Sequence, residues 1–165
     1  MRDVPLICVC GKSGVGKTTV VRESGLREVI SYTTRAMRPG EVDDYDYHFR
    51  SQEWMDTHRD KFKLDWKQFG EHTYGATDDD VLGLDVIVIT LDSAIYLRNI
   101  GVLTYIIWLD GPIRMKRERS VNVANGPELM ESVDRILTNE GTVEQLAEEL
   151  RLIQSSLTII ADAIS

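Results

Sequence analysis

The feature that most constrains this chain is a glycine-rich octapeptide near its amino terminus. Residues 11–18 read Gly-Lys-Ser-Gly-Val-Gly-Lys-Thr and match the pattern G-x-x-x-x-G-K-[ST]. An apolar, strand-like run precedes the octapeptide, and a helix-like stretch follows it. Glycines let such a loop turn its backbone amides toward a polyphosphate, and the amino end of the following helix adds positive potential. The pattern therefore predicts a nucleoside triphosphate site at the end of a β-strand.

The octapeptide, which we call the P-loop, also assigns roles to single side chains. We expect Lys17 to reach the β- and γ-phosphates of ATP, and the Thr18 hydroxyl to ligate the Mg²⁺ ion that accompanies ATP. The predicted residues around the ATP phosphates are Ser13, Gly14, Val15, Gly16, Lys17, Thr18 and Thr19.

The rest of the chain predicts an α/β fold with a mainly parallel sheet, because short runs rich in β-branched residues alternate with helix-like stretches. The expected core strands are Leu6–Cys10, Glu28–Ser31, Asp85–Thr90, Leu103–Leu109 and Ser156–Ala161. The expected helices are Lys17–Ser24, Ser93–Ile100, Pro127–Asn139 and Thr142–Gln154. The last of these opens with the Thr142 and Gln145 spacing of a capping box.

Two segments interrupt this pattern. Residues 32–80 are polar, aromatic and acidic, with strand-like pieces at 47–50, 64–69 and 72–76, which favours an insertion. Residues 111–126 are rich in basic side chains and suit a lid. A chain of 165 residues has the length of one ordinary domain. We therefore expect a single domain with a core of 1–31, 81–110 and 127–165, an insertion of 32–80 and a lid of 111–126.

The charge balance excludes several classes of partner. The chain has 19 Lys and Arg against 27 Asp and Glu, a net charge of −8, which disfavours nonspecific binding to nucleic acid or to an anionic membrane. No apolar run approaches the roughly 18 residues of a membrane span, and the amino terminus lacks the features of a signal peptide. We expect a cytoplasmic monomer or homodimer whose partners are small molecules.

Cysteines and histidines indicate no further chemistry. Cys8 and Cys10 stand two apart in an apolar run, which is poor geometry for a disulfide, so we expect buried free thiols. His48, His58 and His72 have no metal-ligand spacing.

Several stretches after the P-loop resemble the guanylate kinase family. Residues 31–42 followed by 46–49 are similar to its signature S-x-T-T-R-x-x-R-x-G-E-x with D-Y-x-F. Residues 65–69 and 74–77 resemble E-W-A-x-F and Y-Y-G-[ST]. The resemblance covers residue 6 to about residue 92. It implies a parallel sheet of the P-loop NTPase type flanked by helices, with an inserted nucleoside-monophosphate-binding subdomain and a lid.

The residues of this signature suit a nucleoside monophosphate. Guanidinium forks match phosphate oxygens in pairs, and a carboxylate can accept hydrogen bonds from both N1–H and N2–H₂ of guanine. The resemblance implies that two arginines and two tyrosines hold the phosphate, while two aspartates and a serine lie at the base. The GMP-binding set implied in this way is Ser31, Arg35, Arg38, Tyr47, Asp65, Tyr74 and Asp92.

Catalysis of phosphoryl transfer needs positive charge around the transferring group. We expect Lys17 and Arg35 to supply part of it. The basic run at 114–119 makes Arg119 a lid candidate, and Arg135 corresponds to a family arginine that contacts the transferring phosphoryl group.

The chain also departs from the family pattern. Thr90 replaces the first aspartate of a D-x-D motif, and Ala76 replaces a hydroxyl that helps to hold the base. With a last strand at 156–161, Ala161 stands where the family has an asparagine, and the usual final helix is missing. These departures bear on base specificity and on adenine contacts, and they leave the phosphate-binding residues in place.

The favoured function is a nucleoside monophosphate kinase that transfers the ATP γ-phosphoryl group to GMP or dGMP, with Mg²⁺. One alternative is a deoxynucleoside monophosphate kinase of broader base specificity. A second is a noncatalytic guanylate-kinase-like binding module, although such modules generally lack a working P-loop.

Overall fold

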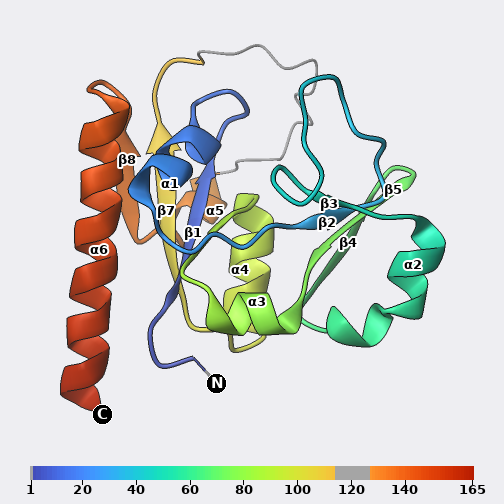
Figure 1. Cartoon of the computed structure of the whole chain (residues 1–165). Coiled ribbons are helices and arrows are strands. Elements are labelled where there is room, and N and C mark those ends of the chain that lie inside the picture. Colours follow the sequence, from blue (N-terminus) through green and yellow to red (C-terminus); the bar gives the residue numbers. More distant parts are fainter. Residues whose placement is uncertain (1, 114–126) are drawn as a thin grey trace. The chain divides into compact units, whose positions relative to one another are not determined.

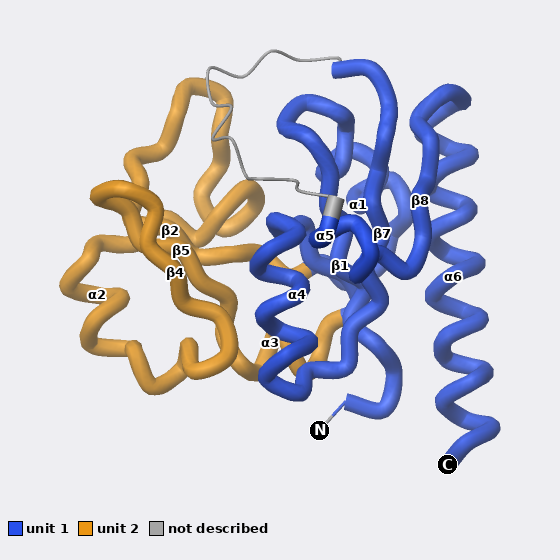
Figure 2. The backbone as a smooth tube through the Cα atoms, turned by 180° about the vertical axis from the view of Figure 1, so that it is seen from behind, with its two compact units in different colours: residues 1–28, 85–165 blue, residues 29–84 orange. Residues whose placement is uncertain are grey.

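The chain has the α/β fold that the sequence predicts, and it divides into two compact units. The computed structural model describes residues 2–113 and 127–165 (Figure 1). Unit 1 comprises residues 1–28 and 85–165, and unit 2 comprises residues 29–84 (Figure 2). Because each unit has its own sheet, each is described by itself.

Unit 1 is built on a parallel sheet with the strand order β6-β1-β7-β8. Its strands are β1 (Leu6–Gly11), β6 (Val86–Val88), β7 (Thr104–Asp110) and β8 (Arg135–Thr138). In register, Ile7 of the central strand β1 pairs with Val86 on one side and with Tyr105 on the other. Since all four strands run the same way, their carboxyl ends meet at one edge, the edge at which the P-loop follows β1.

Helices cover both faces of this sheet. Helix α1 (Lys17–Ser24) packs with α6 (Val143–Ile164), whereas α4 (Leu91–Asn99) lies on β1 and β7, and the opposite views of Figures 1 and 2 show the two layers. A short helix, α5 (Pro127–Met130), precedes β8. Alternate residues of β1 face opposite layers: Ile7 and Val9 join the core that contains Leu146 and Leu150 of α6. This core fixes the strand end that carries the P-loop.

Unit 2 has a second four-stranded sheet with the order β3-β2-β5-β4. Its elements are β2 (Tyr32–Thr33), β3 (His48–Phe49), α2 (Gln52–Thr57), a 3₁₀ turn (Arg59–Lys61), β4 (Asp65–Phe69), β5 (His72–Ala76) and α3 (Asp78–Gly83). Strands β2 and β3 are parallel, and the other pairs are antiparallel.

One face of this second sheet is held by aromatic packing. The rings of Tyr32 and Trp54 stack with centroids 5.4 Å apart, and Phe62 meets Tyr32 edge-on at 5.2 Å. The guanidinium of Arg59 lies 4.0 Å above the ring of Trp66. Tyr32 and Trp66 both pair with Gly75, so these rings lie on the face of the sheet opposite Tyr74.

The predicted strand Ser156–Ala161 is wrong, because these residues belong to α6, which continues to Ile164. The apolar positions Leu146, Leu150, Ile153 and Leu157 keep the spacing of three and four that one helix face requires, and no glycine or proline interrupts them. The expectation that a final helix is missing is wrong for the same reason.

Two further boundaries differ from the prediction. The expected helix Pro127–Asn139 ends at Met130, and residues 135–138 form β8. An Asp134 carboxylate oxygen accepts a hydrogen bond from the Ile106 amide at 2.7 Å, so this segment is anchored alongside β7, where pairing with a strand outweighs helical propensity. The expected strand Glu28–Ser31 is wrong too, since only Glu28 forms an isolated bridge, with Val86.

Several local predictions are confirmed. The Thr142 hydroxyl accepts from the Gln145 amide at 3.2 Å, and the Gln145 side chain accepts from the Thr142 amide at 2.9 Å, so the capping box is complete. Cys8 and Cys10 are buried free thiols. Among the helices that the structure describes, none combines the length and the apolar character needed to cross a membrane.

Candidate nucleotide-binding sites

The P-loop needs glycine at the positions where the pattern has it. A Cβ on Gly11 would lie 2.5 Å from the carbonyl oxygen of Leu109, so the strand end can pass its neighbour only without a side chain. Gly14 and Gly16 have φ angles of 83° and 103°, in the left-handed region that other residues seldom adopt. The loop therefore makes a tight turn directly into α1.

The amino end of α1 is left for a ligand of negative charge. Gly16 is the N-cap and supplies no capping side chain, and no acidic residue lies in the first turn. The ammonium of Lys17 is held over the loop, where its Nζ donates to the carbonyl oxygens of Gly11 at 2.7 Å and Lys12 at 2.9 Å. Thr18 follows in the first turn of α1, with the exposed Thr19 beside it, and Ser13 is exposed in the loop. Helix dipole, amides and ammonium thus converge on one short segment.

A residue that the sequence did not single out braces this loop. Asn139 directly follows β8, is 2% exposed, and donates from Nδ2 to the carbonyl oxygen of Val15 at 2.8 Å. The backbone N–H of Asn139 donates to the Asp110 carbonyl oxygen at 2.7 Å. Asn139 was missed because residues 127–139 were predicted to be a helix. The misplaced last strand put Ala161 at the position where the family has an asparagine. An asparagine after the run Ile136-Leu137-Thr138 is the signal that could have found it.

Two of the acceptor residues predicted in unit 2, Tyr74 and Asp65, share one face of its sheet. Tyr74 of β5 lies opposite Thr33 of β2 and Lys67 of β4, and Asp65 lies opposite Ala76. Since paired residues point to the same side and alternate residues of a strand do so too, these side chains lie on one face. This is the face opposite the aromatic packing of Tyr32.

Arg35 is fixed at this face by a carboxylate. Its Nη1 and Nη2 atoms donate to the two oxygens of Glu41 at 3.0 and 2.8 Å, and Nη1 also donates to the Ala36 carbonyl. The side chain is 7% exposed, and its guanidinium lies 5.4 Å from the ring centroid of Tyr47 and 5.5 Å from that of Phe49. The hydrogen bonds to Glu41 raise the pKa of Arg35, against the lowering effect of burial.

Glu41 also holds the backbone of the second arginine. Its Oε2 accepts from the Arg38 amide at 2.7 Å, across a turn in which Pro39 precedes Gly40 with φ of 86°. The hydrogen bonds from Arg35 lower the pKa of Glu41, and that from the Arg38 amide adds to the effect, although partial burial opposes it. Glu41 stands in the signature E position, and its role becomes visible only from its contacts with Arg35 and the Arg38 amide.

Asp65 is buried and has a cationic neighbour. Its Oδ1 lies 3.1 Å from the Nζ atom of Lys67, and the two side chains are 5% and 24% exposed. The family motif E-W-A-x-F has alanine where this chain has Lys67. That departure was the signal for an additional charge at this face.

The remaining candidates are spread over both units. The Ser31 carbonyl accepts from the His48 amide at 2.9 Å, which anchors the segment before β2. Asp92 is exposed in the first turn of α4, which is part of unit 1. The other six predicted GMP-binding residues belong to unit 2. Arg119 lies outside the described residues.

The structure does not bring Arg135 to the P-loop. Arg135 opens β8 and pairs with Ile107, which in turn pairs with Val9, two residues before Gly11. Its side chain is half exposed and lies 3.8 Å from the Glu149 carboxylate of α6. Its prediction as a phosphoryl-contacting residue rests on the correspondence with a family arginine alone.

Comparisons with known proteins identify the relatives of this chain. The family model described as guanylate kinase matches residues 4–88, half of the chain. A guanylate kinase of Prochlorococcus marinus subsp. pastoris is 31% identical over 93% of this chain and 82% of its own length. One of Streptococcus pneumoniae is 31% identical over 97% and 80%. The crystal structure of guanylate kinase from Anaplasma phagocytophilum shares the fold, with a TM-score of 0.66 and 18% identity over 94% of this chain and 87% of that one.

Proposed function

The chain belongs to the guanylate kinase family and is an ATP-dependent nucleoside monophosphate kinase, and on this premise we propose that its acceptor is GMP. The observation that carries the proposal is the buried carboxylate of Asp65, which lies on the same sheet face as Tyr74. A carboxylate accepts from N1–H and N2–H₂ of guanine, whereas adenine offers an acceptor at N1. Residues 32–80, within unit 2, would then form the monophosphate-binding insertion, and residues 111–126, of which 114–126 lie outside the described residues, would form the lid.

We assign the binding of ATP, the phosphoryl donor, to the P-loop. Residues 13–19 would hold the ATP phosphates through backbone amides, with Lys17 on the β- and γ-phosphates. Mg²⁺ fits this set, because Mg²⁺ is commonly held by substrate phosphates and few protein oxygens, and Thr18 offers a hydroxyl at the uncapped end of α1. No group of three or more His, Cys, Asp or Glu side chains in residues 2–113 and 127–165 could hold the ion without the phosphates. When bound, Mg²⁺ would neutralise phosphate charge.

The acceptor half falls to the side chains around Arg35. Three of its five N–H donors serve Glu41 and Ala36, so at most two can reach an oxygen of the acceptor phosphate. Tyr47 and Tyr74 have rings 6.2 Å apart and would add their hydroxyl groups, and Arg38 would add a second guanidinium. This set suits a dianionic monophosphate.

No general base is needed for the transfer, because a phosphate monoester is already a nucleophile near neutral pH. The work left to the protein is orientation, charge stabilisation and exclusion of water. We assign the charge stabilisation to Lys17 and Arg35, with Arg119 of the lid as a third group. Arg135 is not part of this proposal, because its side chain lies against α6.

A coupled assay of ADP release tests the acceptor. GMP, dGMP, dTMP and AMP are compared at equal concentration, with ATP and Mg²⁺ in excess. We expect kcat/KM for GMP to exceed that for AMP and dTMP by about 100-fold or more, since mismatched donors and acceptors are rejected strongly at a polar site. The Lys17→Ala variant controls for contaminating kinases. Similar values for all four acceptors would contradict the assignment of guanine.

A further inference from the structure

Asp65 and Lys67 form a charged pair on the acceptor face, the face of the unit 2 sheet that also carries Tyr74. The family signature does not contain this pair. Both residues lie on β4, two apart, so they project from the same side of the strand. The carboxylate is almost completely buried, and the ammonium reaches it at 3.1 Å. A side chain held this way presents one acceptor group and one donor group at a fixed separation.

Neither partner is saturated by the contact. An ionised carboxylate has about four lone-pair sites, and an ammonium has three N–H donors. One N–H of Lys67 and one site on Oδ1 of Asp65 make the ion pair. Both groups therefore retain capacity for a polar ligand that offers donors and an acceptor side by side.

We propose that Lys67 is a specificity-determining residue that donates a hydrogen bond to O6 of guanine while Asp65 accepts from N1–H and N2–H₂. The proposal rests on the proposed function, because it assigns a further reader of the same base. Guanine presents its two donors and its O6 acceptor along one edge, which matches a carboxylate beside an ammonium.

The same pair rejects adenine by polarity. Adenine has an acceptor at N1, which would meet the carboxylate, and an amino group at C6, which would meet the ammonium. The first contact would set two acceptors against each other, and the second would set two donors against each other. Polar groups left without a hydrogen bond in this way lower the free energy of binding. Lys67 therefore offsets the shorter reach of Asp65, which stands where the family usually has glutamate, and the alanine that stands at position 76.

Base analogues separate this role from a general effect of charge. Inosine monophosphate keeps O6 and N1–H but lacks the N2 amino group, whereas 2-aminopurine ribonucleoside monophosphate keeps the amino group and lacks both O6 and the N1–H donor. For Lys67→Met, kcat/KM should fall about 10- to 100-fold for GMP and for the inosine analogue, as expected for loss of a hydrogen bond to a charged group. For the 2-aminopurine analogue it should change about twofold or less, because there is no O6 to contact.

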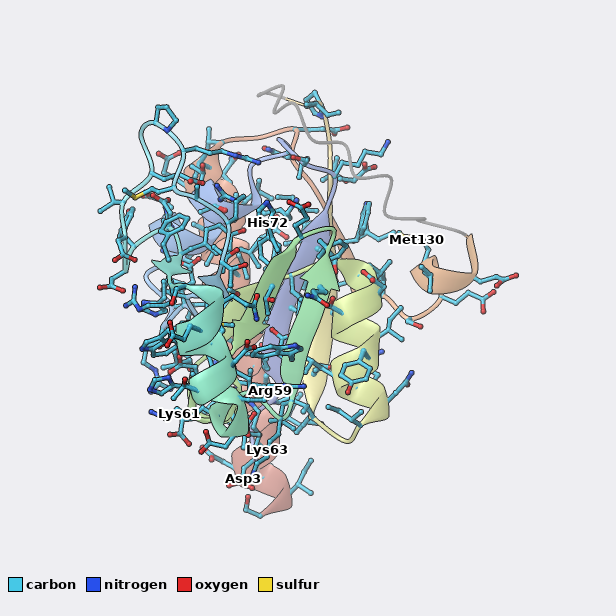
Figure 3. The ribbon with its side chains drawn as sticks, turned by 90° about the vertical axis from the view of Figure 1, so that its right-hand side faces the viewer. Asp3, Arg59, Lys61, Lys63, His72 and Met130 are labelled. Carbon is cyan, nitrogen blue, oxygen red and sulfur yellow. The ribbon has the colours of Figure 1, made fainter. Side chains whose placement is uncertain are left out.

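The matched control is Lys63→Met, which removes the same charge from an exposed residue just before β4 (Figure 3). A general attraction for an anionic substrate would lower kcat/KM for every acceptor in both variants. Lys67→Met leaves Asp65 without its cation, so the double variant Asp65→Glu, Lys67→Ala provides a second test with the residues of the family motif. Its GMP-over-2-aminopurine ratio should exceed that of Lys67→Met, because the longer glutamate side chain restores the reach that Lys67 otherwise offsets.

The outcomes are distinct. An equal loss for GMP and the 2-aminopurine analogue, or an unchanged ratio between them in both variants, would overturn the role of Lys67 while GMP phosphorylation by the unmodified chain stands. If the unmodified chain prefers another acceptor over GMP, the proposed function fails in that first measurement, and the role of Lys67 fails with it.

Discussion

The two proposed phosphate sites of this molecule differ in the groups that form them, since one is mainly backbone and the other is mainly side chains. The P-loop of unit 1 is one contiguous segment, in which backbone amides, two left-handed glycines and one lysine form the proposed site for the ATP phosphates. The acceptor face of unit 2 is assembled from side chains on separate strands and loops, and those side chains are held by one another, as Arg35 is by Glu41. The first site is a local property of the chain, and the second is a property of its tertiary structure.

The difference predicts how each site fails. In the P-loop a single side chain carries most of the sensitivity, because the backbone supplies the rest. On the acceptor face, residues that never touch the substrate matter nearly as much as those that do, because they aim the arginine and the carboxylate. Substitutions in the P-loop should leave GMP binding unchanged, and substitutions on the acceptor face of unit 2 should leave ATP binding unchanged.

The largest effect is expected for Lys17→Ala. Loss of the ammonium should lower kcat about 100- to 1000-fold, since its charge is needed where negative charge develops on the γ-phosphoryl group. The dissociation constant of GMP, measured by calorimetry, should stay the same. Lys12→Ala, in the same loop but exposed, is the control and should leave kcat within about threefold. Loss of GMP binding in Lys17→Ala would contradict the separation of the two sites.

The next largest effect is expected for Glu41→Gln. A neutral amide cannot accept both N–H groups of Arg35, so the guanidinium loses its fixed position and KM for GMP should rise about tenfold. KM for ATP should not change. Glu71→Gln, at an exposed residue of unit 2, controls for the loss of one negative charge. A lower KM for GMP would show instead that Glu41 competes with the phosphate for Arg35.

A smaller effect is expected for Asn139→Ala, which removes the hydrogen bond to the Val15 carbonyl. KM for ATP should rise about three- to tenfold, because the P-loop loses its brace, and KM for GMP should stay constant. Steady-state kinetics with each substrate varied in turn makes the distinction. Asn99→Ala, at the exposed end of α4, should have no effect on either KM. A change confined to GMP would remove Asn139 from the donor site.

The free energy of unfolding tests the packing of unit 1 without involving the transfer reaction. Thr142→Ala removes the hydroxyl of the capping box of α6, which packs with α1 in unit 1. The free energy of unfolding should fall by about 1 kcal/mol, or about 2–4 °C in Tm. Ser155→Ala, exposed within α6, should be neutral or slightly stabilising. The affinity of unit 2 for GMP should not move in either variant.

The smallest effect is a pH dependence that comes from Glu41. Its pKa in the folded chain is lowered from its ordinary value of 4.5, mainly by Arg35. The carboxylate therefore contributes stability above about pH 4.5, and this contribution is lost as the pH falls through the lowered pKa. The difference in unfolding free energy between the unmodified chain and Glu41→Gln should shrink below that pH. A difference that grows on acidification would contradict the ion pair.

The comparison also explains what could be predicted from the sequence. The P-loop and the capping box were predicted because their contacts join residues that are close in sequence, such as Thr142 and Gln145. The last strand was misplaced because Ile159 and Ile160 have strand propensity, yet the spacing of Leu150, Ile153 and Leu157 keeps them in a helix. Segment 135–138 became a strand through pairing with β7, which no local pattern reports.

On the acceptor face, residue types were predictable but their partners were not. The signature pointed to Arg35 and Asp65, while Glu41 and Lys67 emerged only when the fold placed them at 2.8 and 3.1 Å from those side chains. Asn139 braces Val15 across 124 residues of sequence, a separation over which sequence patterns carry no information about contact. Side-chain partners are therefore what the structure adds to the sequence, whether they are two residues apart, as Asp65 and Lys67 are, or 124 residues apart.

Transfer of an isotopic label tests the central claim most directly. The chain is incubated with Mg²⁺, GMP and ATP labelled in the γ-phosphoryl group, and the products are separated. Label should appear in the β-phosphate of GDP in amounts equal to the ADP formed, and this transfer should be lost in Lys17→Ala and in Arg35→Ala. Label released as inorganic phosphate, or GDP formed equally well by both variants, would contradict a kinase whose donor and acceptor phosphates are held by the P-loop and by the Arg35 face.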